Sequence, residues 1–282
     1  MPSRQFSTHA NNPESTSVLH DGVPTWMQHS VDEWIRVQIA AGSGYAGQTP
    51  NVDSIRRLER LLRVSLIGTD VLARVFGSMF SRLNADENLK LDVVDGILQT
   101  LDLGSLRIRE LEAILEQSGS KWKVVETENG SHRLEERVDA TVVSAMDDLA
   151  EQPGDASSYM KQAWGDAFGR NPNPSSAYSN TIKAIEAASW QTVTPANSRS
   201  TLGTIIRELI DHPERFQVVI TERAANQGIE TIRQDMSLVW EGQTDRHGTS
   251  NPVAPTQEAA EQAVFIGLSL CQQFIRNLVS HT

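Results

Sequence analysis

The longest helical pattern in the chain runs from Thr256 to Val279, and it limits what the rest of the chain can fold into. Apolar residues recur three or four positions apart along it, at Val264, Leu268, Cys271, Ile275 and Leu278. This is the spacing of one helix face. A helix of this length with one apolar face has to bury that face against other helices. The pattern therefore predicts a bundle in which this segment packs against the others.

Helical periodicity also dominates the residues before this segment. It predicts helices over 24–39, from 53, and over 66–83, 87–101, 105–117, 139–150, 155–168, 177–188, 201–210 and 228–240. Asp53, Ser175 or Ser176, and Thr256 are expected as N-caps. In the first helix, Trp26 and Trp34 are expected on one buried aromatic face. The sequence predicts a mainly α fold.

The period changes once, near 121–138. Two segments that favour strands, 121–126 and 131–138, flank Thr127–Gly130. Asn129-Gly130 favours the positive backbone angles of a tight hairpin turn. We expect a β-hairpin here, within a helical domain over 23–152 that follows a disordered tail over 1–22. A break at Gln152-Pro-Gly-Asp then leads into a second helical bundle over 153–282.

Composition narrows the class of protein. The 282 residues carry a net charge of −11 and a mean hydropathy of −0.35, which excludes an extended basic surface for nucleic acid. Neither a membrane span nor a secretory signal is visible. The single cysteine, Cys271, lies on the apolar stripe and predicts a packed thiol in a reducing cytoplasm. One cysteine and seven scattered histidines form no zinc pattern, and neither a metal nor a cofactor is expected.

Four arginines stand close together after Asp53, and two interpretations of them stay open. Arg56, Arg60 and Arg63 share one helix face, with Arg57 beside them. They predict either a stripe that contacts phosphate or a solvated face paired with the surplus acidic residues.

The polar loop over 240–252 is the place where chemistry is expected. Arg246 and His247 are adjacent in it. An imidazole titrates near neutral pH and can move a proton, while a guanidinium can hold a phosphate oxygen. RNA supplies its own nucleophile, the 2′-hydroxyl, so such a site needs no metal. The alternative is a loop that only ends a helix, with Arg246 paired to Asp245 or Glu241.

Three stretches carry a resemblance to a known family: Ala177-Tyr-Ser-Asn-Thr-Ile-Lys-Ala-Ile-Glu-Ala-Ala188, Thr201-Leu-Gly-Thr-Ile-Ile206 and Trp240-Glu-Gly-Gln-Thr-Asp-Arg-His-Gly248. From about Ala177 onward the chain resembles the abortive-infection C-terminal domain, a branch of the HEPN helical superfamily. Residues 91–138 resemble, more faintly, the N-terminal domain often attached to it.

This resemblance implies a HEPN-like bundle that forms a homodimer and brings two histidine-containing loops into one cleft. Many relatives are metal-independent ribonucleases used against phage, with an arginine a few residues before the histidine. Here Glu241 stands near that position, and Arg246 is directly before His247. The resemblance places Lys183 and Glu186 in the second-helix pattern and Gly248 beside the catalytic pair. We expect Lys183, Glu186 and Gly248 on the substrate side, although the spacing of Lys183 and Glu186 also permits a surface ion pair.

The leading hypothesis is therefore a cytoplasmic anti-phage defence or toxin protein that binds and cleaves RNA, with His247 as acid/base and Arg246 on the phosphate. A second hypothesis is a catalytically silent module that dimerises and binds a protein or nucleotide partner, such as a second protein of a defence system. A third is a bundle that binds a small molecule among Trp164, Trp190 and Trp240. These tryptophans also suit core positions.

Overall fold

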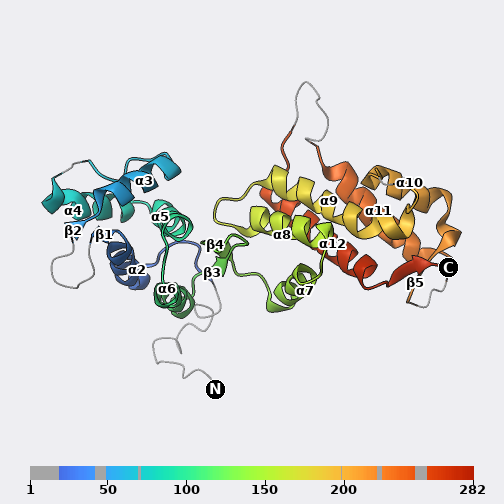
Figure 1. Ribbon diagram of the computed structural model, residues 1–282, viewed down its shortest axis with the longest axis horizontal. Coiled ribbons are helices and arrows are strands. Elements are labelled where there is room, and N and C mark those ends of the chain that lie inside the picture. The colour runs from blue at the N-terminus through green and yellow to red at the C-terminus, as the bar shows by residue number, and fades with distance from the viewer. Residues whose placement is uncertain (1–18, 42–48, 69–70, 198, 221–223, 245–252) are drawn as a thin grey trace, which may run out of the picture. The chain divides into compact units, whose positions relative to one another are not determined.

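The computed structural model describes residues 19–41, 49–68, 71–197, 199–220, 224–244 and 253–282. Helices dominate these residues, and the only sheets in the described ranges are three antiparallel strand pairs (Figure 1). The predicted mainly α fold is confirmed. The chain divides into two compact units, Met1–Arg137 and Val138–Thr282. Nowhere in the described part does a helix combine the length and the apolar content needed to cross a membrane.

The N-terminal unit consists of helices with one hairpin and one very short strand pair. Its elements are α2 (Thr25–Gln38), β1 (Ala40–Ala41), β2 (Thr49–Pro50), α3 (Val52–Leu62), α4 (Leu72–Leu83), α5 (Glu87–Thr100), α6 (Ser105–Gln117), β3 (Trp122–Glu126) and β4 (His132–Glu136). Their apolar faces form one buried cluster. The aromatic face of α2 is only half as predicted, because Trp34 is buried at 4% exposure whereas Trp26 is 62% exposed.

Helix α5 is the centre of this unit, since both α3 and the hairpin pack on it. A side chain at Gly96 would lie 3.1 Å from Leu58 of α3, so the two helices approach closely at this glycine. Asp95, which is buried, accepts hydrogen bonds from the backbone N–H of Leu134 at 2.7 Å and from Gln99 at 2.6 Å. Burial raises the pKa of Asp95, although these two hydrogen bonds act in the opposite direction.

The predicted hairpin is confirmed, with a longer loop than a two-residue turn. β3 and β4 pair antiparallel from Trp122↔Glu136 to Glu126↔His132. Of the two turn residues, Gly130 takes a positive φ of 80°, while the side chain of Asn129 accepts from the N–H of Ser131 at 3.1 Å.

The end of the predicted tail is held against the hairpin. Residues 1–18 lie outside the described residues, but His20 forms a β-bridge with Ser120. The carbonyl of Asp21 accepts from the indole N–H of Trp122 at 2.8 Å. Residues 19–22 therefore belong to the packed unit.

The C-terminal unit is a helical bundle. Its elements are α7 (Ala140–Ala150), α8 (Asp155–Phe168), α9 (Pro174–Val193), α10 (Leu202–Asp211), the 3-10 turn η2 (Pro213–Arg215), β5 (Phe216–Val218), α11 (Gln227–Gly242), α12 (Gln257–Ile275) and β6 (Val279–His281). The unit begins earlier than the predicted domain over 153–282, because α7 packs in this bundle. Met146 and Leu149 of α7 join its core, and Gln272 of α12 donates to the carbonyl of Ala145 at 2.8 Å.

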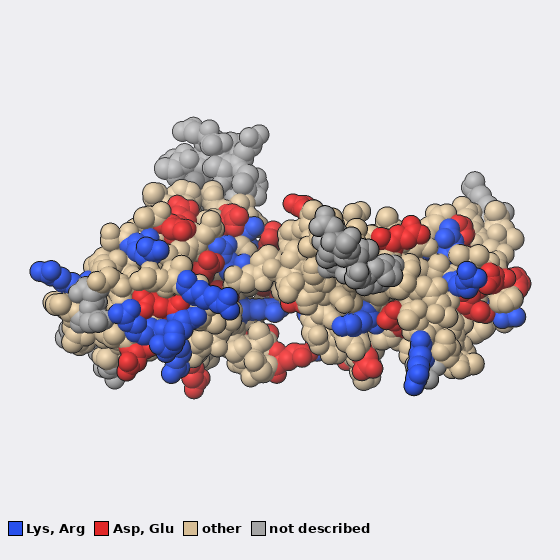
Figure 2. Space-filling model, turned by 90° about the horizontal axis from the view of Figure 1, so that it is seen from above, with Lys and Arg blue, Asp and Glu red and all other residues tan. Residues whose placement is uncertain are grey.

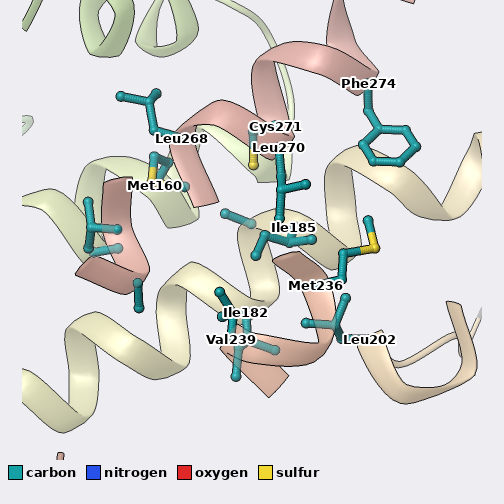
Figure 3. Close-up of a cluster of buried hydrophobic side chains, with 14 of the residues drawn as sticks. Met160, Ile182, Ile185, Leu202, Met236, Val239, Leu268, Leu270, Cys271 and Phe274 are labelled. Atoms are coloured by element: carbon teal, nitrogen blue, oxygen red, sulfur yellow. The ribbon is translucent and has the colours of Figure 1, made fainter. Parts of the chain in front are cut away.

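Helices α9 and α12 form the middle of the bundle, and their buried side chains meet those of the surrounding helices (Figure 3). They pack closely at Gly267, where a side chain would lie 2.4 Å from Cγ2 of Thr181. Cys271 is fully buried in this core, and burial raises the pKa of its thiol to about 12. This agrees with a packed thiol.

The terminal helix ends four residues before Val279, the end predicted from the pattern. α12 stops at Ile275, Asn277 takes a positive φ of 53°, and Val279 begins β6. β6 pairs antiparallel with β5. Val279 therefore pairs with Val218 of β5 instead of extending the helix.

Candidate functional site

The predicted catalytic residues Arg246 and His247, with Gly248, lie in the stretch 245–252, outside the described residues. A helix lies on either side of this stretch. α11 ends at Gly242, and Thr256 caps α12 by accepting from the N–H of Ala259. The hydroxyl of Thr244 donates to the carbonyl of Val253, which ties the two flanks together.

Two glycines bring α11 onto α9 and α10 just before this stretch. Trp240 lies across Gly203 in the first turn of α10, where an added Cβ would be 2.9 Å from Cζ2 of the indole. Gly242 lies against the hydroxyl of Tyr178 of α9, where an added Cβ would be 2.3 Å from the phenolic oxygen. Only a residue without a side chain fits either position unless the ring shifts.

Glu186 makes the third connection among these helices. Its Oε1 accepts from the backbone N–H of Leu202 at 2.6 Å, at the start of α10. Burial raises the pKa of Glu186, while the hydrogen bond from Leu202 and the charge of Lys183 lower it. The carboxylate thus satisfies one of the N–H groups that a helix start leaves without an intrahelical acceptor. Through this hydrogen bond the carboxylate joins α9 to the start of α10.

Lys183 lies on the exposed side of α9, one turn before Glu186. Its Nζ donates to Oδ1 of Asn180 at 3.4 Å and lies 5.5 Å from the ring centre of Tyr159. No carboxylate of the described ranges forms an ion pair with it, so the i, i+3 pair with Glu186 that the spacing permits is not made. The ammonium is available to an anion from solution.

A small polar network supports Asn180, the partner of Lys183. Asn180 is buried, and its amide nitrogen lies 3.4 Å from both Oδ2 of Asp166 and Oγ of Ser176. Ser176 donates to the same carboxylate oxygen at 2.6 Å. This network was not predicted from the sequence. The i, i+4 spacing of Ser176 and Asn180 was a visible signal, but Asp166 comes from another helix.

Arg233 and Glu241 lie on α11, upstream of the predicted catalytic pair. Arg233 donates from Nε to Oε2 of Glu230 at 2.7 Å and from Nη2 to Oε1. The hydrogen bonds that Arg233 donates to Glu230 raise the pKa of Arg233, and the charges of Glu230 and Glu241 add to this effect. This guanidinium is therefore engaged within α11. Glu241 is exposed.

The described residues also locate the three tryptophans and the side chains that could bind a metal. Among the described residues, no group of three or more His, Cys, Asp or Glu side chains could hold a metal ion. Trp164 is buried and packs on Phe168 with ring centres 4.5 Å apart. Trp190 and Trp240 are partly buried and also pack against the core. The tryptophans thus have core positions.

Comparison of the chain with family models, with curated proteins and with solved structures finds no match.

Proposed function

We propose that this protein is a HEPN-type relative of the abortive-infection proteins, an anti-phage defence or toxin protein that binds RNA and cleaves it without a metal ion. One observation carries the proposal. The stretches 177–188 and 201–206 and the described part of 240–248 meet at one place, through the pairs Glu186–Leu202, Gly203–Trp240 and Tyr178–Gly242. In the chain, the stretch that holds Arg246 and His247 follows directly after this place.

The proposed reaction follows from the chemistry of these side chains. His247 accepts the proton of a ribose 2′-hydroxyl, and that oxygen attacks the neighbouring phosphorus. The bond from phosphorus to the 5′-oxygen breaks, and a protonated imidazole returns a proton to the leaving oxygen. Arg246 neutralises the charge that develops on the phosphate. The products are a 2′,3′-cyclic phosphate and a 5′-hydroxyl.

Lys183 would supply a second cation for the RNA. It is exposed, belongs to the same stretch as Glu186 and Tyr178, and forms no ion pair with a described carboxylate. Glu186 enters the proposal only as the residue that joins α9 to α10. In a cytoplasmic homodimer, two copies of the His247 loop would share one cleft, so that one imidazole acts as base and the other as acid.

A second candidate is a catalytically silent module that dimerises and binds a protein or nucleotide partner. Glu241 favours it, because an exposed carboxylate near the position expected for an arginine repels phosphate. Arg233 could take the place of that arginine only by breaking its hydrogen bonds to Glu230.

The test is incubation of total RNA with purified protein in the presence of EDTA. We expect His247→Ala and Arg246→Ala to abolish cleavage, since an acid/base group contributes about 10²–10⁴-fold, and Lys183→Gln to weaken it. His132→Ala and Arg207→Ala are matched controls at a half-buried strand histidine and an exposed helix arginine, and both should cleave as the wild type does. Cleavage that survives His247→Ala would refute the proposal. No cleavage by the wild type, together with a dimer in light scattering, would favour the silent module.

A further inference from the structure

Helix α3 presents a group of arginines whose charges are not neutralised by the fold. Arg56 is the exception, because its Nη1 forms an ion pair with Glu59 at 2.7 Å. Arg57, Arg60 and Arg63 are exposed, and within the described ranges no carboxylate forms an ion pair with them. We call Arg57, Arg60 and Arg63 the arginine surface. It differs from the face of Arg56, Arg60 and Arg63 expected from spacing, because Arg56 turns to Glu59.

The packing of α3 keeps this surface in solvent. Ile55 and Leu58 are buried on the other side of the helix, and Leu58 meets α5 at Gly96. Arg57 and Arg60 are three residues apart, which puts them side by side on the exposed side. The arginines are therefore presented by a helix that cannot rotate without exposing its apolar face.

The position of Arg63 is fixed by the turn that ends the helix. Arg63 has a positive φ of 54°, and its N–H donates to the carbonyl of Glu59. The carboxylate of Glu59 accepts from the N–H groups of Leu66 at 2.7 Å and Ile67 at 3.1 Å. Burial raises the pKa of Glu59, but the hydrogen bonds from Arg56, Ile67 and Leu66 outweigh it and lower the pKa. Glu59, the neighbour of Arg60 in the sequence, is thus used inside the turn.

The local charge is opposite to that of the whole chain. The protein carries −11, yet α3 and its C-cap combine four arginines with the two acids Asp53 and Glu59. Figure 2 shows basic side chains gathered on the N-terminal unit, on the side where Figure 1 draws α3. An acidic protein repels polyanions at long range, so a local excess of arginine is the arrangement that a phosphate contact would need.

We propose that the arginine surface binds the phosphates of single-stranded RNA. The planar guanidinium group donates two parallel hydrogen bonds to a phosphate, and its face can stack on an unpaired base. The carboxylates of an acidic protein could also pair with these positive charges. They offer no base on which a guanidinium can stack, so RNA is favoured. This inference concerns the N-terminal unit and requires no cleavage at His247. RNA binding by the arginine surface can therefore be refuted without refuting the proposed nuclease, and the reverse also holds.

The experiment measures binding of a fluorescent single-stranded RNA with 2′-O-methyl sugars, which lacks the nucleophile and stays intact. The full chain is compared with the double variant R57Q/R60Q and with R63N, since asparagine tolerates a positive φ. The control is R107Q/R109Q, which removes two arginines from α6 of the same unit and changes the net charge equally. Circular dichroism checks that all variants are folded.

We expect R57Q/R60Q to bind about tenfold more weakly than the wild type. The slope of log K against log salt should become shallower by about 0.7 for each lost phosphate contact. R63N should lose part of the affinity, and R107Q/R109Q should bind as the wild type does. The proposal is overturned if the wild type does not bind this RNA, if the double variant keeps the wild-type slope, or if the control loses as much. Tighter binding of an acidic peptide than of RNA would also overturn it.

Discussion

The contact between Trp240 and Gly203 can be tested with a single methyl group. A Cβ at position 203 would lie 2.9 Å from Cζ2, 3.1 Å from Cε2 and 3.4 Å from Nε1 of the indole. The indole is a rigid bicyclic ring whose atoms move together, and overpacking of this kind costs about 1–3 kcal/mol. Alanine in a helix is better than glycine by about 0.5–1 kcal/mol. We therefore expect Gly203→Ala to lower the free energy of unfolding by about 1 kcal/mol.

Urea unfolding followed by circular dichroism measures this change, and two comparisons make it specific. Trp240→Leu removes the ring atoms that the methyl group meets, so Gly203→Ala in that background should become neutral or stabilising. Gly77 of α4 is the matched control, because a Cβ there meets nothing within 4 Å. Gly77→Ala should stabilise the N-terminal unit by about 0.5–1 kcal/mol.

Two outcomes would refute this reasoning. One is a Gly203→Ala protein that is stabilised as much as Gly77→Ala. The other is an equal loss with and without the indole of Trp240, which would show that the cost arises from α10 itself.

Further outcomes concern three groups that are buried or partly buried, Glu186, Lys90 and Cys271. Glu186→Ala should cost about 1–3 kcal/mol by leaving the N–H of Leu202 without its acceptor. Because burial raises the pKa of Glu186, the folded state binds its proton more tightly than the unfolded state does. The stability that this proton adds is lost as the pH rises through the raised pKa, so Glu186→Gln should flatten the dependence of the urea midpoint on pH above about 4. Lys90→Met should cost about 3–5 kcal/mol, because Lys90 is fully buried and its Nζ lies 2.8 Å from Asp32. Thermal unfolding of Lys90→Met checks this, and Lys90→Met/Asp32→Leu should recover most of the loss. The buried thiol of Cys271, with a pKa of about 12, should react with iodoacetamide only as fast as the C-terminal unit unfolds, and rapid labelling of the native protein would contradict its packing.

The candidate site could be predicted from the sequence only in part. The polar segment before α12 and the exposed Lys183 were visible as patterns along the chain. The role of Glu186 could not be predicted, because the N–H group that its carboxylate accepts from belongs to Leu202, sixteen residues later at the start of α10. The arginines of α3 were recognised as a group, but which of them are neutralised depends on the turn that Glu59 holds.

The N-caps of the helices could also be predicted from the sequence only in part. Thr256 caps α12 as its sequence position indicates, since the cap hydrogen bond spans three residues. At α9 the cap is Asn173 instead of Ser175 or Ser176, because Pro174 occupies the first helical position, where its missing N–H costs nothing. At α3 the cap is Asn51 instead of Asp53, for the strand pair of β1 and β2 brings the chain to Asn51 before the helix starts.

The sequence by itself determined the mainly α class, most helices and the hairpin, because helix and strand periods are properties of a few neighbouring residues. The tertiary structure decided where the two units divide, that Trp26 is exposed while Trp34 is buried, and that the chain from Val279 to His281 forms a strand. It also decided that Gly203 and Gly242 receive Trp240 and Tyr178. These outcomes depend on the shapes of side chains from distant segments, and close packing accepts few arrangements of such shapes.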